Sequence, residues 1–473
     1  MKSTVVYGPP GTGKTTYLVN LMGKRLGQRI GVVSFTKAAA KEMAQRCGIT
    51  AGGNISTLHS YGFRLANVSR EQVISDSWLR ELTKAIGIQF NSVNAYEISE
   101  MTKGQAYMSL YSLARSKLTK DYKSVFMSCP EVGKLTEFLY FVESYESFKR
   151  VYGVVDFSDM LDMATGIDPE VDVLIVDEAQ DLTPQQWALI ESWLPFLQEI
   201  VIAGDDDQSI YKWNGADPAG MPNFEAKHGS QRVVLDQSYR IPDSVHEMAE
   251  RLIRRVPSRV DKTYKPKHGA RGEVNWYGDL RMLTKPKGQT LILVRNHSMR
   301  EDIEEWLISA GVAYVAEGGK PAPLKSRQAN AIRIWKKYQQ NISKTGMDML
   351  NDKEWGILER NSRPIYRIKL QARQIVRKTW QSVINVEPEL RNYFEKVLES
   401  EGCLPTDSPV KICTIHASKG READRVILIN GMGQKTAESK DRDSEIRTFY
   451  VAITRTKQQL DIVMGANPLR ELI

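Results

Sequence analysis

The sequence has 473 residues, of which 41% are hydrophobic and 26% are charged. A chain of this length exceeds one ordinary core, so we expect three or four domains of a soluble globular protein. The net charge of +8 is spread along the chain and argues only weakly for a polyanionic partner. No apolar run reaches the length of a membrane span, and four scattered cysteines favour a reduced, cytoplasmic protein without a structural metal site.

The first motif lies at the start of the chain, where residues 8–15 read GPPGTGKT. The β-branched run Thr4–Tyr7 before it predicts a buried strand, and the apolar spacing from Thr15 to Leu26 predicts a helix. A strand, a glycine-rich loop and a helix in this order are the context of a phosphate-binding loop. The predicted loop consists of Gly8, Pro9, Pro10, Gly11, Thr12, Gly13, Lys14 and Thr15.

The residue types of this loop suit a nucleotide with bound Mg²⁺. Glycines let successive backbone N–H groups converge on phosphate oxygens, and the helix N-terminus adds positive potential. We expect Lys14 to reach the terminal phosphates and the Thr15 hydroxyl to bind Mg²⁺. The sequence therefore predicts a nucleotide-binding protein.

Strand-like apolar runs and helical patterns alternate along most of the chain, which predicts an α/β fold with parallel sheets. Two stretches are polar and helix-like instead, and we interpret them as helical insertions in two sheet domains. The runs that predict strands are Thr4–Tyr7, Ile30–Ser34, Val173–Val176, Ile200–Ala203, Thr290–Val294, Lys411–Thr414 and Arg425–Ile429. The predicted domains are 1–64 with 152–232, its insertion 65–151, 233–318 with 405–473, and its insertion 319–404.

A second motif, Val171–Asp181, reads VDVLIVDEAQD and ends a predicted strand in two acids. Ligands of open α/β sheets bind beyond the carboxyl ends of the strands, so the two acids should lie beside the phosphate loop. We expect Asp177 to hold Mg²⁺ and Glu178 to act as general base for γ-phosphate hydrolysis. An apolar run ending in two acids is often only a strand leaving the core, but the upstream loop favours a nucleotide hydrolase.

Four further segments narrow this prediction. They are Ser34–Ala40, Gly204–Trp213, Thr414–Glu422 and Tyr450–Arg455. In this order and spacing, the chain resembles the superfamily 1 DNA helicases of the UvrD/Rep type. The resemblance covers nearly the whole chain except the two insertions, and it implies two RecA-like domains with ATP bound between them.

The resemblance assigns several residues to the γ-phosphate. Gln208 matches the family's γ-phosphate sensor, while Arg240 and Arg455 match two arginines that reach this phosphate from the second domain. Such arginines neutralise charge that develops on the transferred group. With Lys14 on one domain and Arg455 on the other, closure of the cleft would depend on the γ-phosphate.

The resemblance also implies contacts to the base and ribose. Tyr239 matches a residue that stacks on the base, Glu422 one near the ribose, and Gly420 lies in the same segment. Thr16 stands in the nucleotide site where relatives often have an arginine, and seven residues precede Gly8 where the family usually has an adenine-reading glutamine segment. We therefore expect relaxed nucleotide selectivity, with base recognition resting mainly on Tyr239.

A third group of residues matches the family's DNA contacts. Aromatic rings stack on bases of any sequence, and hydroxyl or imidazole donors suit the phosphate backbone. Trp213 is the strongest candidate because it follows the γ-phosphate sensor by five residues; taken singly, such aromatics are more often core residues. The implied contacts are Phe35, Tyr211 and Trp213 to bases, and Thr36, Thr57, His59, Thr414 and His416 to the backbone.

The leading hypothesis is an ATP- and Mg²⁺-dependent motor that moves along single-stranded DNA, with 3′→5′ polarity implied by the resemblance, and unwinds duplex DNA. Two alternatives stay open: a translocase that removes bound proteins, and a nucleotide-switched DNA-binding or loader subunit. Asn214 replaces a common arginine after Trp213, which leaves the coupling of hydrolysis to DNA binding open. We expect a functional monomer whose partners are single-stranded DNA, its junctions with duplex, and replication or repair proteins.

Overall fold

The computed structural model describes residues 1–25, 27–35, 37–46, 54–90, 102–129, 132–318, 321–347, 349–373 and 376–472. The chain divides into two compact units. The first consists of Met1–Ile241, Glu250–Ala270 and Asp441–Tyr450, and the second of Pro242–Ala249, Arg271–Lys440 and Val451–Ile473. No helix in these described ranges combines the length and apolar character needed to cross a membrane.

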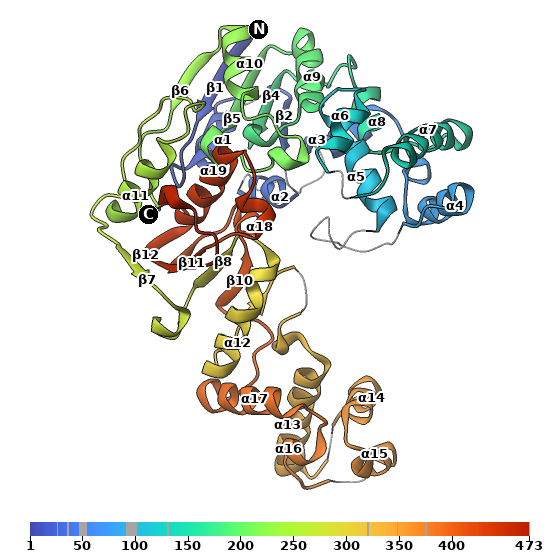
Figure 1. Cartoon of the computed structure of the whole chain (residues 1–473), viewed down its shortest axis with the longest axis vertical. Helices are drawn as coiled ribbons and strands as arrows, with labels where there is room; N and C mark the ends of the chain where they lie inside the picture. Colours follow the sequence, from blue (N-terminus) through green and yellow to red (C-terminus); the bar gives the residue numbers. More distant parts are fainter. Residues whose placement is uncertain are drawn as a thin grey trace. The chain divides into compact units, whose positions relative to one another are not determined.

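The first unit is built on a six-stranded parallel sheet in the order β3-β2-β4-β5-β1-β6 (Figure 1). Its strands are β1 (Lys2–Tyr7), β2 (Ile30–Ser34), β3 (Ile55–Thr57), β4 (Val173–Asp177), β5 (Glu199–Gly204) and β6 (Gln231–Val234). The register pairs Ser34 with Asp177 and Tyr7 with Gly204, so these strands end at one edge of the sheet. The loops that carry the predicted motifs begin at this edge.

Helices cover both faces of this sheet, which explains why its strands are apolar at consecutive positions. Tyr7 packs in one core cluster with Trp193, whereas its neighbour Val6 packs in another with Leu18. The helices around the sheet are α1 (Lys14–Gly23), α2 (Lys37–Arg46), α3 (Leu58–Leu65), α8 (Phe157–Met163), α9 (Pro184–Trp193) and α10 (Gly220–His228).

Between α3 and α8, the described residues of the first unit form four helices with a core of their own. This core is rich in aromatic side chains, among them Tyr107, Phe141 and Tyr145. The helices are α4 (Asp76–Ile86), α5 (Lys103–Ser116), α6 (Tyr122–Met127) and α7 (Leu135–Tyr152). The first predicted insertion thus consists, in its described residues, of helices and loops.

The second unit is built on another six-stranded parallel sheet, in the order β7-β12-β11-β8-β10-β9 (Figure 1). Its strands are β7 (Glu273–Tyr277), β8 (Thr290–Val294), β9 (Val315–Ala316), β10 (Val410–Thr414), β11 (Ala423–Asn430) and β12 (Thr456–Met464). Together the two sheets confirm the predicted α/β class.

Helices of the second unit share one continuous core with its sheet, since Trp335 and Tyr338 lie in the same cluster as Ile292 and Ile412. They are α12 (Arg300–Ala310), α13 (Arg327–Thr345), α14 (Asp352–Asn361), α15 (Pro364–Gln371), α16 (Trp380–Val383) and α17 (Pro388–Glu401). Further helices are α11 (Asp243–Ile253), α18 (Gln434–Ala437) and α19 (Arg442–Ile453). The predicted boundaries between each sheet domain and its insertion stay a prediction.

Candidate nucleotide and DNA site

The phosphate loop connects β1 to α1, as the sequence predicts. Gly13, the residue before α1, has a left-handed backbone with φ of 78°, which glycine adopts without strain. The Lys14 side chain folds back over Gly8, and its Nζ donates a hydrogen bond to the Gly8 carbonyl at 3.0 Å. A Cβ on Gly8 would lie 2.0 Å from Lys14 Cγ, so any other residue at this position would force the Lys14 side chain to move.

The segment after β6 packs against the phosphate loop. Tyr239 N–H donates to the Gly11 carbonyl at 2.8 Å, and Ser238 Oγ donates to the Pro10 carbonyl at 2.9 Å. A Cβ on Gly11, where φ is 73°, would lie 2.5 Å from Arg240 Cβ. The phosphate loop and the segment that carries Tyr239 and Arg240 are therefore in contact, although more than 220 positions separate them in the chain. The Tyr239 side chain is 71% exposed at this position.

The two acids end β4 at the same edge of the sheet. Asp177 is buried, and Glu178 adopts a left-handed backbone with φ of 55°. Such a conformation is strained for a non-glycine residue and is typical of functional sites. Glu178 Oε1 lies 3.7 Å from Lys14 Nζ, which brings the second predicted motif beside the first.

Electrostatics of this pair suit a bound cation. Burial, together with the neighbouring Glu178, raises the pKa of Asp177 to about 7, while Lys14 opposes that rise. Two close carboxylates and the Thr15 hydroxyl are oxygen donors, the chemistry that Mg²⁺ prefers. The donor set therefore fits the predicted metal, which would keep both carboxylates ionised.

Hydrogen bonds connect Glu178 to the predicted γ-phosphate sensor. Gln180 Nε2 donates to Glu178 Oε2 at 2.6 Å, and Gln180 Oε1 accepts from the Asp205 N–H at 3.0 Å. Asp205 Oδ2 in turn accepts from Gln208 Nε2 at 2.7 Å. Sequence reasoning missed Gln180 and Asp205, although both lie inside the segments that it singled out.

Thr16 is exposed on the first turn of α1 and has a basic neighbour from α2. Arg46 Nη1 donates to Thr16 Oγ1 at 3.2 Å, while Arg46 Nη2 pairs with Glu42 at 2.6 Å. The position where relatives often have an arginine is thus approached by an arginine from another helix.

The aromatic residues predicted to contact bases lie together. The rings of Phe35 and Tyr211 are stacked with centroids 5.4 Å apart, and Tyr211 meets Trp213 edge-on at 6.3 Å. Trp213 is 65% exposed, so it is a surface residue rather than a core residue. Phe35 follows β2 directly, which places the row at the carboxyl edge of the first sheet.

Two other predicted DNA contacts of the first unit, Thr57 and His59, lie at the start of α3. Thr57 caps α3, because its side chain accepts from the Ser60 N–H at 3.2 Å. His59 meets the ring of Phe157 edge-on at 5.8 Å, and burial lowers the pKa of His59. Phe157 is 63% exposed and was missed by sequence reasoning, since a single aromatic at a helix start carries no signal of its own. Thr36 lies outside the described residues.

In the second unit, the predicted residues lie at two edges of the sheet. Thr414 ends β10 and accepts from the Ala417 N–H at 3.3 Å, and His416 begins the turn that follows. Glu422 and Arg455 precede the adjacent strands β11 and β12, where the Ala423 N–H donates to the Arg455 carbonyl at 3.0 Å.

Side-chain contacts further define this second edge. Arg455 Nε donates to the Val451 carbonyl at 3.0 Å, and Glu422 pairs with Lys457 at 2.6 Å. Gly420 has a left-handed backbone with φ of 80° in the turn before β11. The structure therefore brings Gly420, Glu422 and Arg455 to one edge within the second unit.

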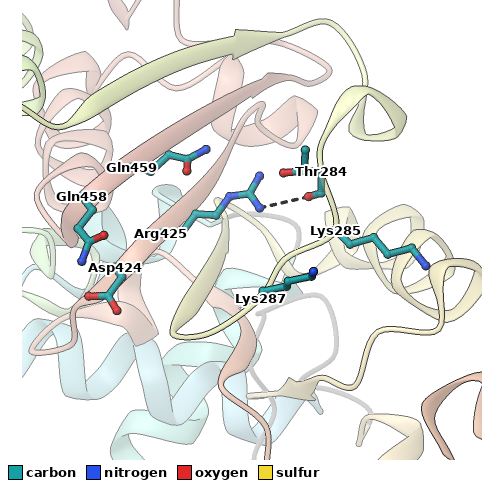
Figure 2. A pocket seen from close by; sticks show the side chains of 7 residues that line it. All are labelled: Thr284, Lys285, Lys287, Asp424, Arg425, Gln458 and Gln459. Carbon is teal, nitrogen blue, oxygen red and sulfur yellow. Dashed lines mark hydrogen bonds between the residues drawn. The ribbon is translucent and has the colours of Figure 1, made fainter. Parts of the chain in front are cut away.

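A cavity of about 580 Å³ lies near the beginnings of β8, β11 and β12. Figure 2 shows that its basic side chains do not converge: Arg425 points to the Thr284 carbonyl, whereas Lys285 extends away from it. Arg425 is also paired with Asp461 at 2.6 Å, and Lys285 Nζ donates to the Ala310 carbonyl. Arg425 and Lys285 are thus engaged by other groups of the second unit, and none of the predicted site residues lines this cavity.

Two family models match the chain. Residues 1–229 match the UvrD/REP helicase N-terminal domain, and residues 324–466 match the UvrD-like helicase C-terminal domain. The ATP-dependent DNA helicase UvrD2 of Mycobacterium tuberculosis is 23% identical, over 95% of this chain and 75% of that protein. The ATP-dependent DNA helicase Rep of Escherichia coli is 25% identical, over 54% of this chain and 42% of Rep.

The ATP-dependent DNA helicase PcrA of Leuconostoc citreum is 23% identical, over 65% of this chain and 47% of PcrA. Each of these three relatives is longer than the part that this chain matches, which is 75% of UvrD2, 42% of Rep and 47% of PcrA. The chain nevertheless matches both the N-terminal and the C-terminal domain of the family, in this order, and it contains two parallel sheets. The chain belongs to the UvrD/Rep family of DNA helicases.

Proposed function

We propose that this protein is an ATP-driven DNA helicase that moves 3′→5′ along single-stranded DNA and separates duplex DNA. The observation that carries the proposal is the connected path from Lys14 through Glu178, Gln180 and Asp205 to Gln208. A passive nucleotide-binding subunit has no need of a general base linked to a γ-phosphate sensor. The relatives of this chain named above are ATP-dependent DNA helicases, which supports the same proposal.

Hydrolysis would proceed by attack of water on the γ-phosphate. Glu178 accepts the proton of this water, and its carboxylate lies 3.7 Å from the ammonium of Lys14. Lys14 also binds the terminal phosphates, and Gln208 senses the γ-phosphate. Arg240 and Arg455 neutralise the charge that develops on the transferred group.

The remaining contacts would hold the metal, base and ribose. Thr15 and Asp177 are the residues that would hold Mg²⁺, which neutralises phosphate charge when bound. Tyr239 would stack on the base, since it is exposed directly beside the phosphate loop. Glu422 and Gly420 would approach the ribose.

Single-stranded DNA would bind along the aromatic row at the carboxyl edge of the first sheet. Phe35, Tyr211 and Trp213 offer ring faces, and Phe157 adds an exposed ring beside His59. Stacking on aromatic rings tolerates any base, as a motor that moves along DNA requires. Only five positions separate Gln208 from Trp213, so a change at the γ-phosphate reaches the bases over one short segment.

The test combines an ATPase assay with a strand-separation assay. We expect single-stranded DNA to stimulate ATP hydrolysis and a duplex with a 3′ tail to be separated in preference to one with a 5′ tail. Stimulated hydrolysis without strand separation would favour the protein-removing translocase, and negligible hydrolysis would favour the nucleotide-switched subunit. We further propose that the protein functions as a monomer and works beside replication or repair proteins. Sedimentation of the protein with DNA would test the monomeric state.

A further inference from the structure

Three consecutive aspartates follow β5 and are almost completely buried. Asp205, Asp206 and Asp207 are 0%, 1% and 1% exposed, respectively. Carboxylates are rarely buried together, because each loses its hydration and repels the other two. Gln208, the predicted γ-phosphate sensor, directly follows these aspartates.

The charge partner of all three aspartates is Lys262, a residue that is itself 4% exposed. Its Nζ lies 3.3 Å from Asp205 Oδ1, 2.6 Å from Asp206 Oδ1 and 2.7 Å from Asp207 Oδ2. Burial alone would lower the pKa of Lys262, but the three carboxylates raise it above its ordinary value. The three carboxylates therefore favour the charged form of Lys262.

A second cation, Arg259, forms an ion pair with one of the aspartates, Asp207. Its Nε and Nη2 donate to the two carboxylate oxygens of Asp207 at 2.9 Å and 2.7 Å. Within the described part of the chain, Asp205 forms an ion pair with Lys262 alone. The two basic residues of this segment thus have separable roles.

Asp205 is the link from Lys262 to Gln208. Its Oδ1 faces Lys262 Nζ, while its Oδ2 accepts from Gln208 Nε2 at 2.7 Å. An ionised carboxylate can only accept hydrogen bonds, so the Gln208 side-chain amide must turn its nitrogen toward Asp205. The orientation of the amide is therefore fixed by a carboxylate that is itself held by Lys262.

We propose that Lys262 is a positioning residue for γ-phosphate sensing, acting through Asp205 on the Gln208 amide. The inference rests on the proposed function, in which Gln208 senses the γ-phosphate. Without the cation, Asp205 would face two neighbouring carboxylates and would move or take up a proton. Either change removes the fixed acceptor that orients Gln208, and misplacement by about 1 Å can reduce turnover by up to about 100-fold.

The test is a double-mutant cycle on steady-state ATP hydrolysis at saturating single-stranded DNA. We compare Lys262→Met, Gln208→Ala and the double variant, and we measure kcat, KM for ATP and Kd for ADP. Lys262→Met should lower kcat on the order of tenfold and leave Kd for ADP unchanged, because ADP has no γ-phosphate. In the Gln208→Ala background, Lys262→Met should lower kcat no further, since both changes remove the same contact.

Arg259→Gln is the matched control, because it weakens the same buried cluster without touching Asp205. Its effect on kcat should multiply with that of Gln208→Ala. If Lys262→Met does not fold, Asp205→Asn carries the test: it keeps the size of the side chain, leaves two anions facing two cations, and should show the same non-multiplicative loss with Gln208→Ala.

Three outcomes would overturn the inference. A full additional loss of kcat from Lys262→Met in the Gln208→Ala background would reduce Lys262 to a residue that only stabilises the fold, while the proposed function would stand. Equal non-multiplicative behaviour of Arg259→Gln would assign the effect to the whole cluster. Wild-type turnover by Gln208→Ala would contradict the proposed role of Gln208, and the inference would fall with it.

Discussion

At the scale of single residues, the candidate site places Lys14 Nζ 3.7 Å from Glu178 Oε1, and hydrogen bonds continue from Glu178 through Gln180 to Asp205. Lys14 and Glu178 could be named because a phosphate loop and a strand-terminal acid pair have fixed local patterns. Gln180 and Asp205 could not, because their role depends on a hydrogen bond between residues 25 positions apart. Chain separation of this kind leaves no local signal in one sequence.

Glu178→Gln tests the proposed general base. The substitution keeps the shape of the side chain and removes its ability to accept a proton, so ATP binding should persist while kcat falls by about 10² to 10⁴. Binding is measured by titration with ATP, and turnover by release of phosphate. Near-normal turnover would assign proton transfer to another group.

Gly8→Ala tests the packing of Lys14. The added methyl would lie 2.0 Å from Lys14 Cγ, so the lysine must leave its place and turnover should fall on the order of 100-fold. Gly23→Ala is the control, because it lies at the end of the same helix α1 with open space around its Cβ. The idea fails if the two variants hydrolyse ATP at the same rate.

At the scale of elements, the strands predicted from apolar runs are those with both faces covered. β4 and β8 are completely buried, and apart from Asp177 and Thr290 at their ends their residues are apolar. Among the strands that the apolar runs did not predict, β6 is an exposed edge strand, and β12 carries Lys457, Gln458 and Gln459 near its start, before its apolar half. An edge strand buries too little surface to produce a continuous apolar run.

Trp213→Ala tests the aromatic row. Loss of one stacking ring should weaken single-stranded DNA binding by about 1–3 kcal/mol, while ATP hydrolysis without DNA stays near the wild-type rate. Fluorescence anisotropy of a labelled oligonucleotide gives the affinity. The control is Trp276→Ala, since Trp276 is 42% exposed on β7 of the second sheet. Equal losses in both variants would return Trp213 to a structural role.

Lys149→Met tests how helix α7 is joined to α8. Lys149 is 5% exposed and its Nζ lies 3.0 Å from Asp156 and 2.7 Å from Asp159, so the variant leaves two acids without this cation. The expected loss is about 3–5 kcal/mol of the free energy of unfolding, measured by urea titration. Lys84→Met, at an exposed pair with Glu81, should change it by less than about 1 kcal/mol.

The acid limb of the stability profile gives an independent check of this contact. Burial opposes ionisation of Asp159, but Lys149 and other partners lower its pKa below the ordinary value. A carboxyl whose folded pKa is lowered stabilises above its unfolded pKa, and this stability is lost as pH falls through the folded pKa. The wild-type advantage over Lys149→Met should therefore shrink below about pH 4; an advantage independent of pH would contradict the ion pair.

At the scale of the whole molecule, the resemblance of the motifs to the UvrD/Rep-type helicases predicted two parallel-sheet domains, and the structure contains two such sheets. What the sequence could not predict is how each insertion joins its domain. The helices α4–α7 have a separate aromatic core, whereas α13–α17 share one core with the second sheet. Both insertions are polar and helix-like in sequence. A core shared with the sheet and a separate core use the same residue types, so the sequence does not distinguish them.

Single-turnover unwinding tests the central claim most directly, that ATP hydrolysis in the site around Lys14 and Glu178 drives movement along DNA. We predict that the wild-type protein with ATP separates a duplex carrying a 3′ tail faster than one carrying a 5′ tail. Glu178→Gln should bind ATP and the same DNA but separate neither. Strand separation by Glu178→Gln at the wild-type rate would contradict the account.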